Sequence, residues 1–326
     1  MIGFEGVSKS YRGGRLALDD VTFAVPAGGS LGLVGESGSG KTTCVRLALG
    51  LERPTSGRLT FNGLAYPGGR GKLRVLRRQI GFVLQDPYDS LDPRMTVRDV
   101  ITEPLRIHGL LGGRGPGRDA LVTEQLSAVG LPGADLRSYP SRYSGGGRQR
   151  IAIARALITA PSVVICDEPT SSLDVSVQSQ IVNLLLDAGR ARHLSMLFVS
   201  HDLDLIGRVV DTVAVMYGGR IVEIGPAEQI RHSPRHHYTK ALHDAIPADH
   251  PRNRRLAPPA AVPWAAGPDA GNGEAAPRQT GQGTSERRDS CVFASRCLRA
   301  EERCRRERPP MTEEDAGRSY ACFYPI

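Results

Sequence analysis

The chain has 326 residues, of which 40% are hydrophobic and 23% charged, proportions typical of a soluble globular protein with a sizeable core. It carries 42 lysines and arginines against 34 acidic residues, a formal net charge of +8. Such an excess fits nucleic acid, an anionic membrane surface or phosphate ligands equally well. Because the basic residues are spread along the chain, which has one tryptophan, the sequence does not predict direct nucleic-acid binding.

No apolar run approaches the roughly 18 residues that span a bilayer. The longest candidate, ALITAPSVVIC, is interrupted by Pro161. The first residues, MIGFEGVSKSYRGG, lack the cationic and then apolar stretch of a secretory signal. The sequence therefore predicts a chain in the cytoplasm that does not itself cross a membrane.

Residues 1 to about 245 alternate short apolar runs with segments of helical periodicity, a pattern typical of an α/β domain built on a mostly parallel sheet. Apolar runs predict strands at 30–35, 81–85, 162–168, 195–201 and 212–225. Periodic segments predict helices at 97–108, 118–129, 148–158 and 175–190.

The first site motif in chain order is the glycine-rich stretch GESGSGKTT, which fits G-x-x-x-x-G-K-[ST] and stands between an apolar strand and a helix. Glycines in such a loop let backbone amides surround a phosphate, while the lysine reaches the β and γ oxygens and the threonine ligates Mg²⁺. The sequence thus predicts that ATP and Mg²⁺ bind here, at Gly35, Ser37, Gly38, Ser39, Gly40, Lys41, Thr42 and Thr43.

A second motif, SVVICDEP, is an apolar strand that ends in two carboxylates. In open α/β sheets, ligands bind outside the carboxyl ends of the strands. Asp167 is therefore the candidate to hold Mg²⁺, directly or through water. Glu168 is the candidate to orient and deprotonate the attacking water.

A second glycine-rich loop, YSGGGRQRIAIARAL at 143–157, also runs into a helical pattern. Locally it is an N-cap followed by a helix with an apolar stripe. Because one nucleotide needs only one phosphate cradle, the purpose of a second loop is open at this point.

The composition changes after residue 246. Residues 247–289 are rich in Pro, Ala, Gly, Gln and Arg with few branched apolar residues, which predicts a flexible linker between a nucleotide-binding domain at 1–246 and a small module at 290–326. The module is too small to be stabilised by a hydrophobic core alone, so we expect its cysteines to stabilise it through a cross-link or a bound metal.

These cysteines have the spacing C-x5-C-x6-C-x17-C, without the C-x2-4-C knuckle usual in zinc sites. We therefore predict a 4Fe-4S cluster in this module, with zinc or free thiols as the alternatives. The candidate ligands are Cys291, Cys297, Cys304 and Cys322.

Taken in order, the phosphate loop, the DEP strand and the second glycine loop resemble the ATP-binding subunit of an ABC transporter, over nearly the whole chain. The resemblance implies a P-loop ATPase domain with a mixed sheet and a helical signature subdomain. By position, it implies that Tyr11 stacks on adenine and that Gln85 senses Mg²⁺ and the membrane partner. His201 would contact the γ-phosphate and act in hydrolysis with Glu168 and Gln85. The SSLD segment, Ser171–Asp174, would lie at a dimer interface, with Asp174 among the nucleotide-binding candidates.

The resemblance also accounts for the second glycine loop, which stands where the family has LSGGQ. It implies that Ser144, Gly145 and Gly146 face the γ-phosphate bound by a second ATPase subunit, so that two incomplete sites are completed when two subunits meet. The chain departs from the motif at Tyr143, for Leu, and at Gly147, for Gln. Gly147 adds backbone freedom that costs about 0.5–1 kcal/mol of local order, which predicts a working but weakened site.

Two stretches narrow the resemblance. QDPYDSLDPRMTVRDVITEPL is similar to the QNPYSSLNPRMTV stretch of oligopeptide, dipeptide and nickel importers, and the cysteine-bearing tail is similar to their C-terminal module. This implies ATP hydrolysis that energises uptake of di- or oligopeptides. The implied partners are two transmembrane permease subunits, an extracytoplasmic solute-binding protein and a second ATPase subunit, a paralogue, at the cytoplasmic face of the membrane.

Other functions remain as alternatives. Import of nickel or another small solute fits the same motifs. A soluble ABC ATPase acting on nucleic acid would suit the positive charge, although such proteins commonly carry two ATPase domains or coiled-coil insertions. A metabolic P-loop kinase would leave the second glycine loop and the SSLD segment without a purpose.

Overall fold

The computed structural model describes residues 1–111, 116–171, 173–245, 289–314 and 317–326. Its strands are β1 (Ile2–Ser10), β2 (Leu16–Val25), β3 (Ser30–Val34), β4 (Ser56–Phe61), β5 (Leu64–Ala65), β6 (Ile80–Val83), β7 (Val163–Asp167), β8 (Ser195–Ser200), β9 (Thr212–Tyr217), β10 (Arg220–Pro226), β11 (Thr312–Glu314) and β12 (Arg318–Tyr320). Its helices are α1 (Lys41–Ala48), α2 (Arg70–Arg78), α3 (Pro87–Ser90), α4 (Val97–His108), α5 (Pro116–Ala128), the 3-10 turn η1 (Pro140–Arg142), α6 (Gly145–Leu157), α7 (Val175–Arg192), α8 (Leu203–Gly207), α9 (Ala227–His232), α10 (His237–Asp244) and α11 (Glu302–Arg306).

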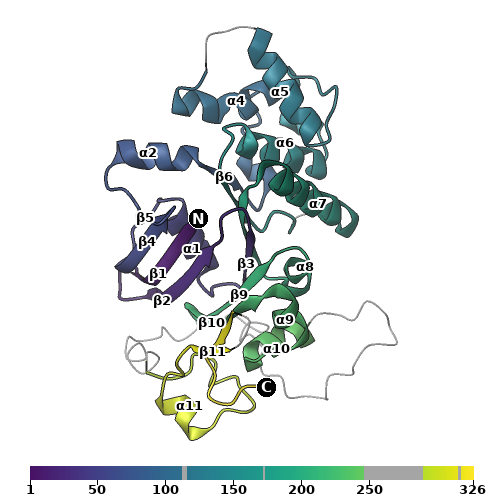
Figure 1. The fold of residues 1–326 in the computed structure, drawn as a ribbon. Helices are drawn as coiled ribbons and strands as arrows, with labels where there is room; N and C mark the ends of the chain where they lie inside the picture. The colour runs from purple at the N-terminus through teal and green to yellow at the C-terminus, as the bar shows by residue number, and fades with distance from the viewer. Residues whose placement is uncertain (112–115, 172, 246–288, 315–316) are drawn as a thin grey trace, which may run out of the picture.

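Two sheets form the scaffold (Figure 1). The larger has the strand order β11-β12-β10-β9-β3-β8-β7-β6, and its strands from β9 to β6 run parallel. The smaller, β2-β1-β4-β5, is antiparallel and comes from the first 65 residues of the chain. The fold is therefore α/β with a mixed main sheet.

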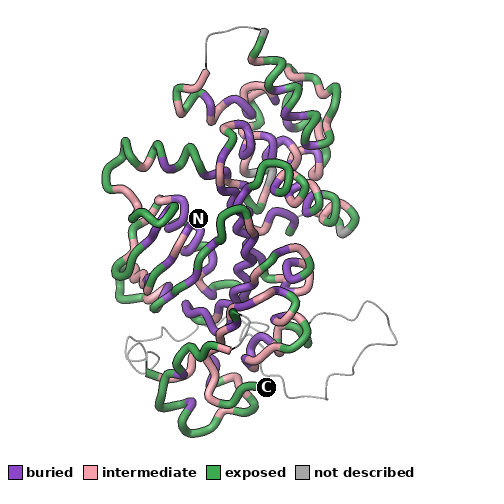
Figure 2. Tube along the Cα trace, in the orientation of Figure 1, coloured by how far each residue is buried: buried purple, intermediate pink, exposed green. Residues whose placement is uncertain are grey.

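Two apolar cores lie on the two faces of the larger sheet, which forms the buried centre of the molecule in Figure 2. One core, which includes Phe4, lies between the two sheets and α1; the other, which includes Phe198, lies under the helices of the opposite face. Strands β3 and β8 are buried along their whole length, which is why SLGLV and SMLFVS are continuous apolar runs. Helix α8 packs so closely on β3 that a Cβ on Gly32 would lie 2.2 Å from Ile206 Cγ2.

Helices α4, α5, α6 and α7 gather at the end of the molecule drawn at the top of Figure 1. Polar side chains cap two of them: the hydroxyl of Thr96 accepts from the amide of Asp99, and that of Ser144 from the amide of Gly147, both at 3.3 Å. Helix α4 ends at His108 and is followed by the C-cap residue Gly109, whose φ of 70° suits glycine. Side-chain caps therefore fix the starts of α4 and α6, and Gly109 fixes the end of α4.

The predicted helices are present, with α4 at the predicted residues and α5, α6 and α7 shifted by a few residues at their ends. Helix α6 begins at Gly145, three residues before the predicted start, because the Ser144 cap draws the glycines into the first turn. The single strand expected at 212–225 is a hairpin of β9 and β10 that turns at Gly218 and Gly219, where φ is 55° and 84°. All but the last residue of the predicted linker at 247–289 lies outside the described residues.

The C-terminal segment, meaning the described residues from 289 onward, joins the larger sheet, because β12 pairs antiparallel with β10. The pairing is reinforced by Glu223, which is fully buried in β10. Its carboxylate accepts from Arg318 Nη2 at 2.6 Å and from the backbone amides of Arg235 at 2.8 Å and His236 at 3.0 Å. The segment is thus far from β10 in the sequence but forms part of the same sheet. The domain boundaries at 246 and 290 stay predictions.

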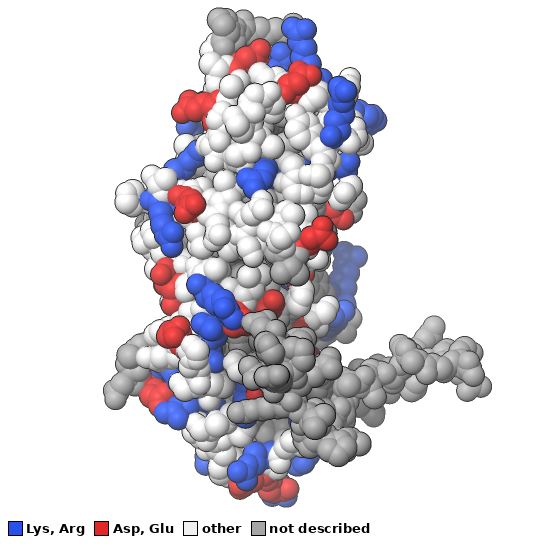
Figure 3. Space-filling view, turned by 90° about the vertical axis from the view of Figure 1, so that its right-hand side faces the viewer, with Lys and Arg blue, Asp and Glu red and all other residues white. Residues whose placement is uncertain are grey.

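No helix in the part of the chain that the structure describes is long and apolar enough to cross a bilayer. On the face drawn in Figure 3, Lys and Arg side chains are interspersed with Asp and Glu, and the described residues of that face form no continuous basic stripe.

Arg318→Met is expected to lower the free energy of unfolding by about 3–5 kcal/mol, because it leaves the buried carboxylate of Glu223 without its counter-charge. Urea unfolding followed by circular dichroism measures the loss. Arg306→Met is the control, since Arg306 pairs with Glu302 on the surface, where the two side chains are 75% and 68% exposed. Equal stability of the two variants would contradict the role given to Arg318.

Candidate functional site

Four parallel strands of the larger sheet end at one edge, and a predicted site residue follows each of them. Strand β3 leads into the loop that carries Lys41, β8 into His201, β7 into Glu168 and β6 into Gln85. Because neighbouring parallel strands finish at the same edge, Gln85 and Glu168 meet although they are 83 residues apart in the chain.

The phosphate loop from Gly35 to Gly40 needs glycine on steric grounds. A Cβ on Gly35 would lie 2.2 Å from the carbonyl oxygen of Met216. Gly38 and Gly40 have φ of 78° and 113°, a region that favours glycine. Gly40 is also the N-cap of α1, so the partial positive charge of the helix N-terminus opens onto the loop.

Lys41 is buried at the start of α1 and donates to the carbonyl oxygens of Gly35 at 2.6 Å and Glu36 at 2.9 Å. Burial lowers the pKa of its ammonium group, and the carboxylates of Glu168 and Asp167 oppose that shift. A buried ammonium group held by backbone carbonyls beside glycine-rich amides is a suitable counter-charge for phosphate.

Asp167 is the last residue of β7 and is partly buried. Burial and the neighbouring charge of Glu168 raise the pKa of its carboxyl group, while Lys41 and Arg46 act in the opposite direction. A divalent cation would stabilise a carboxylate in this position, and Thr42 in the first turn of α1 carries a hydroxyl that could ligate the same ion. The residues present therefore fit Mg²⁺.

Glu168 is held in an uncommon backbone conformation, with φ of 45°. Its amide donates to the carbonyl oxygen of Val199 at 2.9 Å, and its own carbonyl oxygen accepts from the hydroxyl of Ser171 at 3.2 Å. Its Oε2 accepts from Gln85 Nε2 at 3.2 Å and lies 3.4 Å from His201 Nδ1. One carboxylate oxygen thus contacts side chains from the ends of two other strands.

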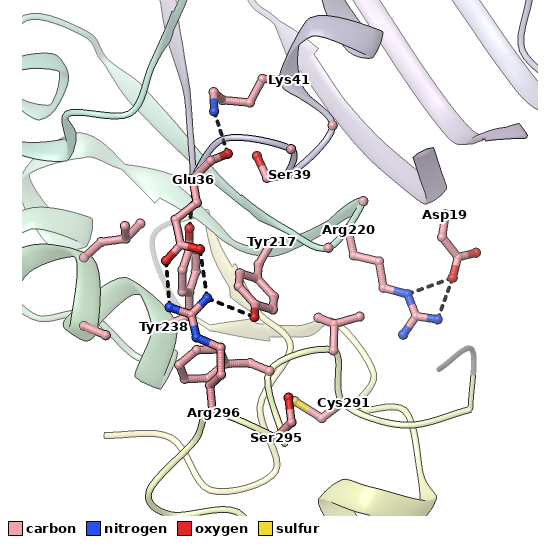
Figure 4. A pocket seen from close by; sticks show the side chains of 18 of the residues that line it. Asp19, Glu36, Ser39, Lys41, Tyr217, Arg220, Tyr238, Cys291, Ser295 and Arg296 are labelled. Carbon is pink, nitrogen blue, oxygen red and sulfur yellow. Dashed lines mark hydrogen bonds and ion pairs between the residues drawn. The ribbon is translucent and has the colours of Figure 1, made fainter. Parts of the chain in front are cut away.

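Lys41, Glu168, Gln85 and His201 line one open cavity of about 2370 Å³, part of which is seen in Figure 4, whereas the predicted site residues Gly35 and Asp167 are not among its lining residues. Tyr11 lies on its wall, where its hydroxyl donates to Glu52 at 3.0 Å and Lys9 Nζ lies 5.3 Å from the ring centroid. The predicted site residues on this wall are Tyr11, Ser37, Gly38, Ser39, Gly40, Lys41, Thr42, Thr43, Gln85, Glu168 and His201.

The second glycine loop does not line this cavity. Ser144 caps α6, and Asp174 is the exposed N-cap residue of α7. The two helix starts pack together, since a Cβ on Gly146 would lie 2.7 Å from Val177 Cγ1. Within one chain the structure therefore keeps the predicted residues Ser144, Gly145, Gly146 and Asp174 apart from the phosphate loop.

Gln149, a fully buried residue of α6, was not among the site residues predicted from the sequence. Its side-chain amide donates to the carbonyl oxygens of Pro169 at 2.8 Å and Leu84 at 3.5 Å. It therefore joins the segments that carry Glu168 and Gln85. A signal was present, because Gln149 is the polar residue among the otherwise apolar or glycine positions buried on this helix.

The four cysteines of the C-terminal segment line one small cavity, Cys291, Cys297, Cys304 and Cys322 together. Burial raises the pKa of the thiols of Cys291, Cys297 and Cys322, that of Cys322 to about 11, and neighbouring cysteines add to each shift. The fold thus brings the cysteines together. Within the described residues, however, no three His, Cys, Asp or Glu side chains are arranged to hold one metal ion, so this geometry does not support the predicted 4Fe-4S cluster or the zinc alternative.

Comparison with protein families agrees with these features. Residues 18–171 match the ABC transporter family, a range that includes the phosphate loop, the DEP strand and the second glycine loop. Residues 222–304 match the family described as the oligopeptide/dipeptide transporter C-terminal region, which runs from β10 to Cys304.

Curated relatives resemble the chain over most of its length. A probable peptide ABC transporter ATP-binding protein, y4tS of Sinorhizobium fredii, is 43% identical over 309 residues, which is 94% of this chain and 82% of that protein. The glutathione import ATP-binding protein GsiA of Escherichia coli K12 is 49% identical over 242 residues, 73% of this chain and 38% of GsiA.

Solved structures share the fold. The cbiO1 protein of Clostridium perfringens, part of the transporter complex cbiONQ, has a TM-score of 0.64 and 27% identity over 70% of this chain and 89% of its own. The dimeric ATP-binding cassette MJ0796, in a post-hydrolysis state bound to ADP and Pi, has a TM-score of 0.63 and 28% identity over 70% of this chain and 99% of its own. The predicted P-loop ATPase fold is confirmed, and the chain belongs to the ABC transporter family as an ATP-hydrolysing subunit with the C-terminal region of oligopeptide/dipeptide transporters.

Proposed function

We propose that this ATPase powers import of di- or oligopeptides through separate membrane subunits. The observation that carries the proposal is the match of residues 222–304 to the oligopeptide/dipeptide transporter region, on a chain 43% identical to a peptide transporter ATPase. Similarity to a glutathione import protein points to the same class, since glutathione is a short peptide. The proposed partners are two transmembrane permease subunits and an extracytoplasmic solute-binding protein, which would place the chain at the cytoplasmic face of the membrane.

Reconstitution of the chain in vesicles with two permease subunits and a solute-binding protein tests the substrate class. Peptide-loaded binding protein is expected to stimulate ATP hydrolysis, and peptide is expected to accumulate in vesicles. Stimulation by nickel alone would replace peptides with nickel as substrate. Tight, strongly salt-dependent binding to duplex DNA or RNA without copurifying membrane subunits would favour the nucleic-acid alternative.

For the hydrolysis step we propose that Glu168 is the general base. The supporting geometry is the contact of its Oε2 with Gln85 and His201 at the edge where the phosphate loop lies. The carboxylate takes a proton from water as the water oxygen bonds to the γ-phosphorus and the bond to the β-phosphate oxygen breaks, which releases ADP. Gln85 and His201 hold the carboxylate in place. Thr42, Asp167 and Gln85 would hold Mg²⁺, which would supply positive charge to the phosphates.

We further propose that the nucleotide site is completed by a second ATPase subunit, a paralogue. What supports this is the position of Ser144, Gly145 and Gly146 outside their own chain's cavity, at the N-terminus of a 13-residue helix. Asp174 lies exposed at the adjacent helix start. The solved relative MJ0796 is itself described as dimeric. In such a pair, the second glycine loop of one subunit would face the γ-phosphate bound by the other.

Glu168→Gln is expected to leave ATP binding intact and to lower kcat at least ~10²-fold, because the amide keeps the size of the side chain but cannot accept a proton. ATP binding and steady-state hydrolysis are measured in the assembled complex. The matched control is Glu313→Gln, which removes an exposed carboxylate in β11. Hydrolysis at the parental rate by Glu168→Gln would remove the assignment of this residue as base.

Gly147→Gln restores the family residue in the second glycine loop. We expect it to raise the ATPase rate of the assembled complex about two- to fivefold, the effect of recovering about 0.5–1 kcal/mol of helix order. The site has little spare room, since a Cβ on Gly147 would lie 3.1 Å from Tyr143 Cβ. Gly147→Ala separates backbone order from the glutamine side chain, and an unchanged rate in both variants would show that the departure is neutral.

The cysteine centre is also kept as a proposal, with a 4Fe-4S cluster preferred to zinc. What supports it is that all four cysteines line one small cavity, although no three such side chains within the described residues are arranged to hold one metal ion. Protein purified anaerobically from iron-supplied cells is expected to absorb near 400 nm and to contain about four irons. Cys304→Ser should abolish both signals, whereas Cys44→Ser, at a fully buried cysteine of α1, should not. Colourless, iron-free protein would overturn the cluster.

A further inference from the structure

A bidentate ion pair joins the C-terminal segment to the phosphate loop. Arg296 Nη1 donates to Glu36 Oε2 at 2.8 Å, and Arg296 Nη2 donates to Glu36 Oε1 at 3.0 Å. The two residues are 260 positions apart, and Glu36 is the residue directly after the first glycine of the GESGSGKTT motif. Figure 4 shows the guanidinium of Arg296 facing this carboxylate from below.

Glu36 is tied to the loop through its backbone as well. Its amide donates to the hydroxyl of Tyr238 at 2.9 Å. Its carbonyl oxygen accepts from Lys41 Nζ at 2.9 Å and from the amide of Ser39 at 3.2 Å. Since the phosphate-contacting lysine and the loop backbone both bond to Glu36, a displacement of this residue displaces the cradle.

Arg296 is itself held in place by a hydrogen-bonded turn and by neighbouring aromatic side chains. It lies in a turn closed by the amides of Arg296 and Cys297, which both donate to the carbonyl oxygen of Phe293 at 3.0 Å. Phe293 is 5% exposed and packs on Tyr217, with ring centroids 5.2 Å apart, and on Tyr238 at 5.4 Å. Arg296 Nη1 also donates to the Tyr217 hydroxyl at 3.2 Å. The aromatic cluster therefore fixes the guanidinium to the same part of the fold that faces the loop.

Charge gives the pair a second effect. The carboxylate of Glu36 stands on the wall of the cavity that the phosphate loop also lines. An anion there repels the triphosphate, and the guanidinium of Arg296 cancels it. Arginine suits this position because its planar fork matches both oxygens of one carboxylate, which a lysine cannot do.

We propose that Arg296 is a positioning residue for ATP binding: it neutralises Glu36 and holds the phosphate loop in its binding conformation. The proposal goes beyond the transport function and depends only on the loop binding ATP. It makes the C-terminal segment a component of the nucleotide site of its own chain.

The test measures ATP affinity of the full-length chain by titration calorimetry, using Glu168→Gln protein so that ATP is not consumed. Arg296→Met is expected to weaken ATP binding about tenfold, comparable to the loss of one charge-assisted hydrogen bond. Arg296→Lys, which keeps the charge but not the fork, is expected to fall in between. Arg306→Met, at the exposed pair with Glu302 in the same segment, is the matched control and should bind as the parent does.

A double-mutant cycle with Glu36→Gln separates positioning from a general structural defect. In the Glu36→Gln background, Arg296→Met should change ATP affinity less than about twofold, because the charge that it neutralises is gone. If Arg296→Met weakens binding equally in both backgrounds, or leaves it unchanged in the parent, the proposal is overturned. If the parent protein, with Arg296 intact, does not bind ATP, the ATPase function itself is refuted. That outcome differs from an unchanged affinity in Arg296→Met, which refutes only the role proposed for Arg296.

Discussion

Parallel pairing of β3, β8, β7 and β6 is the constraint on which the nucleotide site depends. Each strand is hydrogen-bonded along its length to its neighbour, so their carboxyl ends share one edge, and every segment that leaves this edge enters the same space. The register leaves little freedom: Val34 lies opposite Ser200, and Asp167 opposite Val199. Strand pairing alone therefore brings Lys41, Glu168 and His201 to the same edge, independently of contacts between their side chains.

The two apolar cores that pack on the larger sheet stabilise this arrangement of strand ends. Strands β3 and β8 are buried on both faces, and the two cores that cover them are contributed by segments from the whole length of the chain, including Phe293 near the end. This apolar burial offsets the cost of holding Lys41 and Asp167 in partly desolvated positions, where burial lowers the pKa of the lysine and raises the pKa of the aspartate. The buried ion pair of Glu223 and Arg318 joins the C-terminal segment to β10 in another part of the sheet.

The C-terminal segment is therefore better described by its contacts than by its position in the sequence. It extends the main sheet through β12, fills the aromatic cluster around Tyr217 and contacts the phosphate loop through Arg296. Its short strands and few apolar residues give it little capacity to fold alone, and the larger domain supplies the surface that orders it. The sequence predicted a separate module at 290–326 because composition reflects only local preferences for structure. Pairing of strands 95 residues apart is a long-range contact that composition does not reveal.

The sequence by itself determined the phosphate loop, the carboxylate pair at the end of β7, the main helices and the buried parallel strands, because glycine spacing, apolar runs and helical periodicity are local properties. It did not reveal the hairpin of β9 and β10 as two strands, or the antiparallel sheet of β1, β2, β4 and β5, whose irregular register obscures alternation. Only the tertiary structure brought Gln85 and His201 to Glu168, buried Gln149 between their segments, and set Arg296 against Glu36. Those contacts depend on how distant strands align, and alignment is fixed by packing of the whole chain rather than by any single stretch of it.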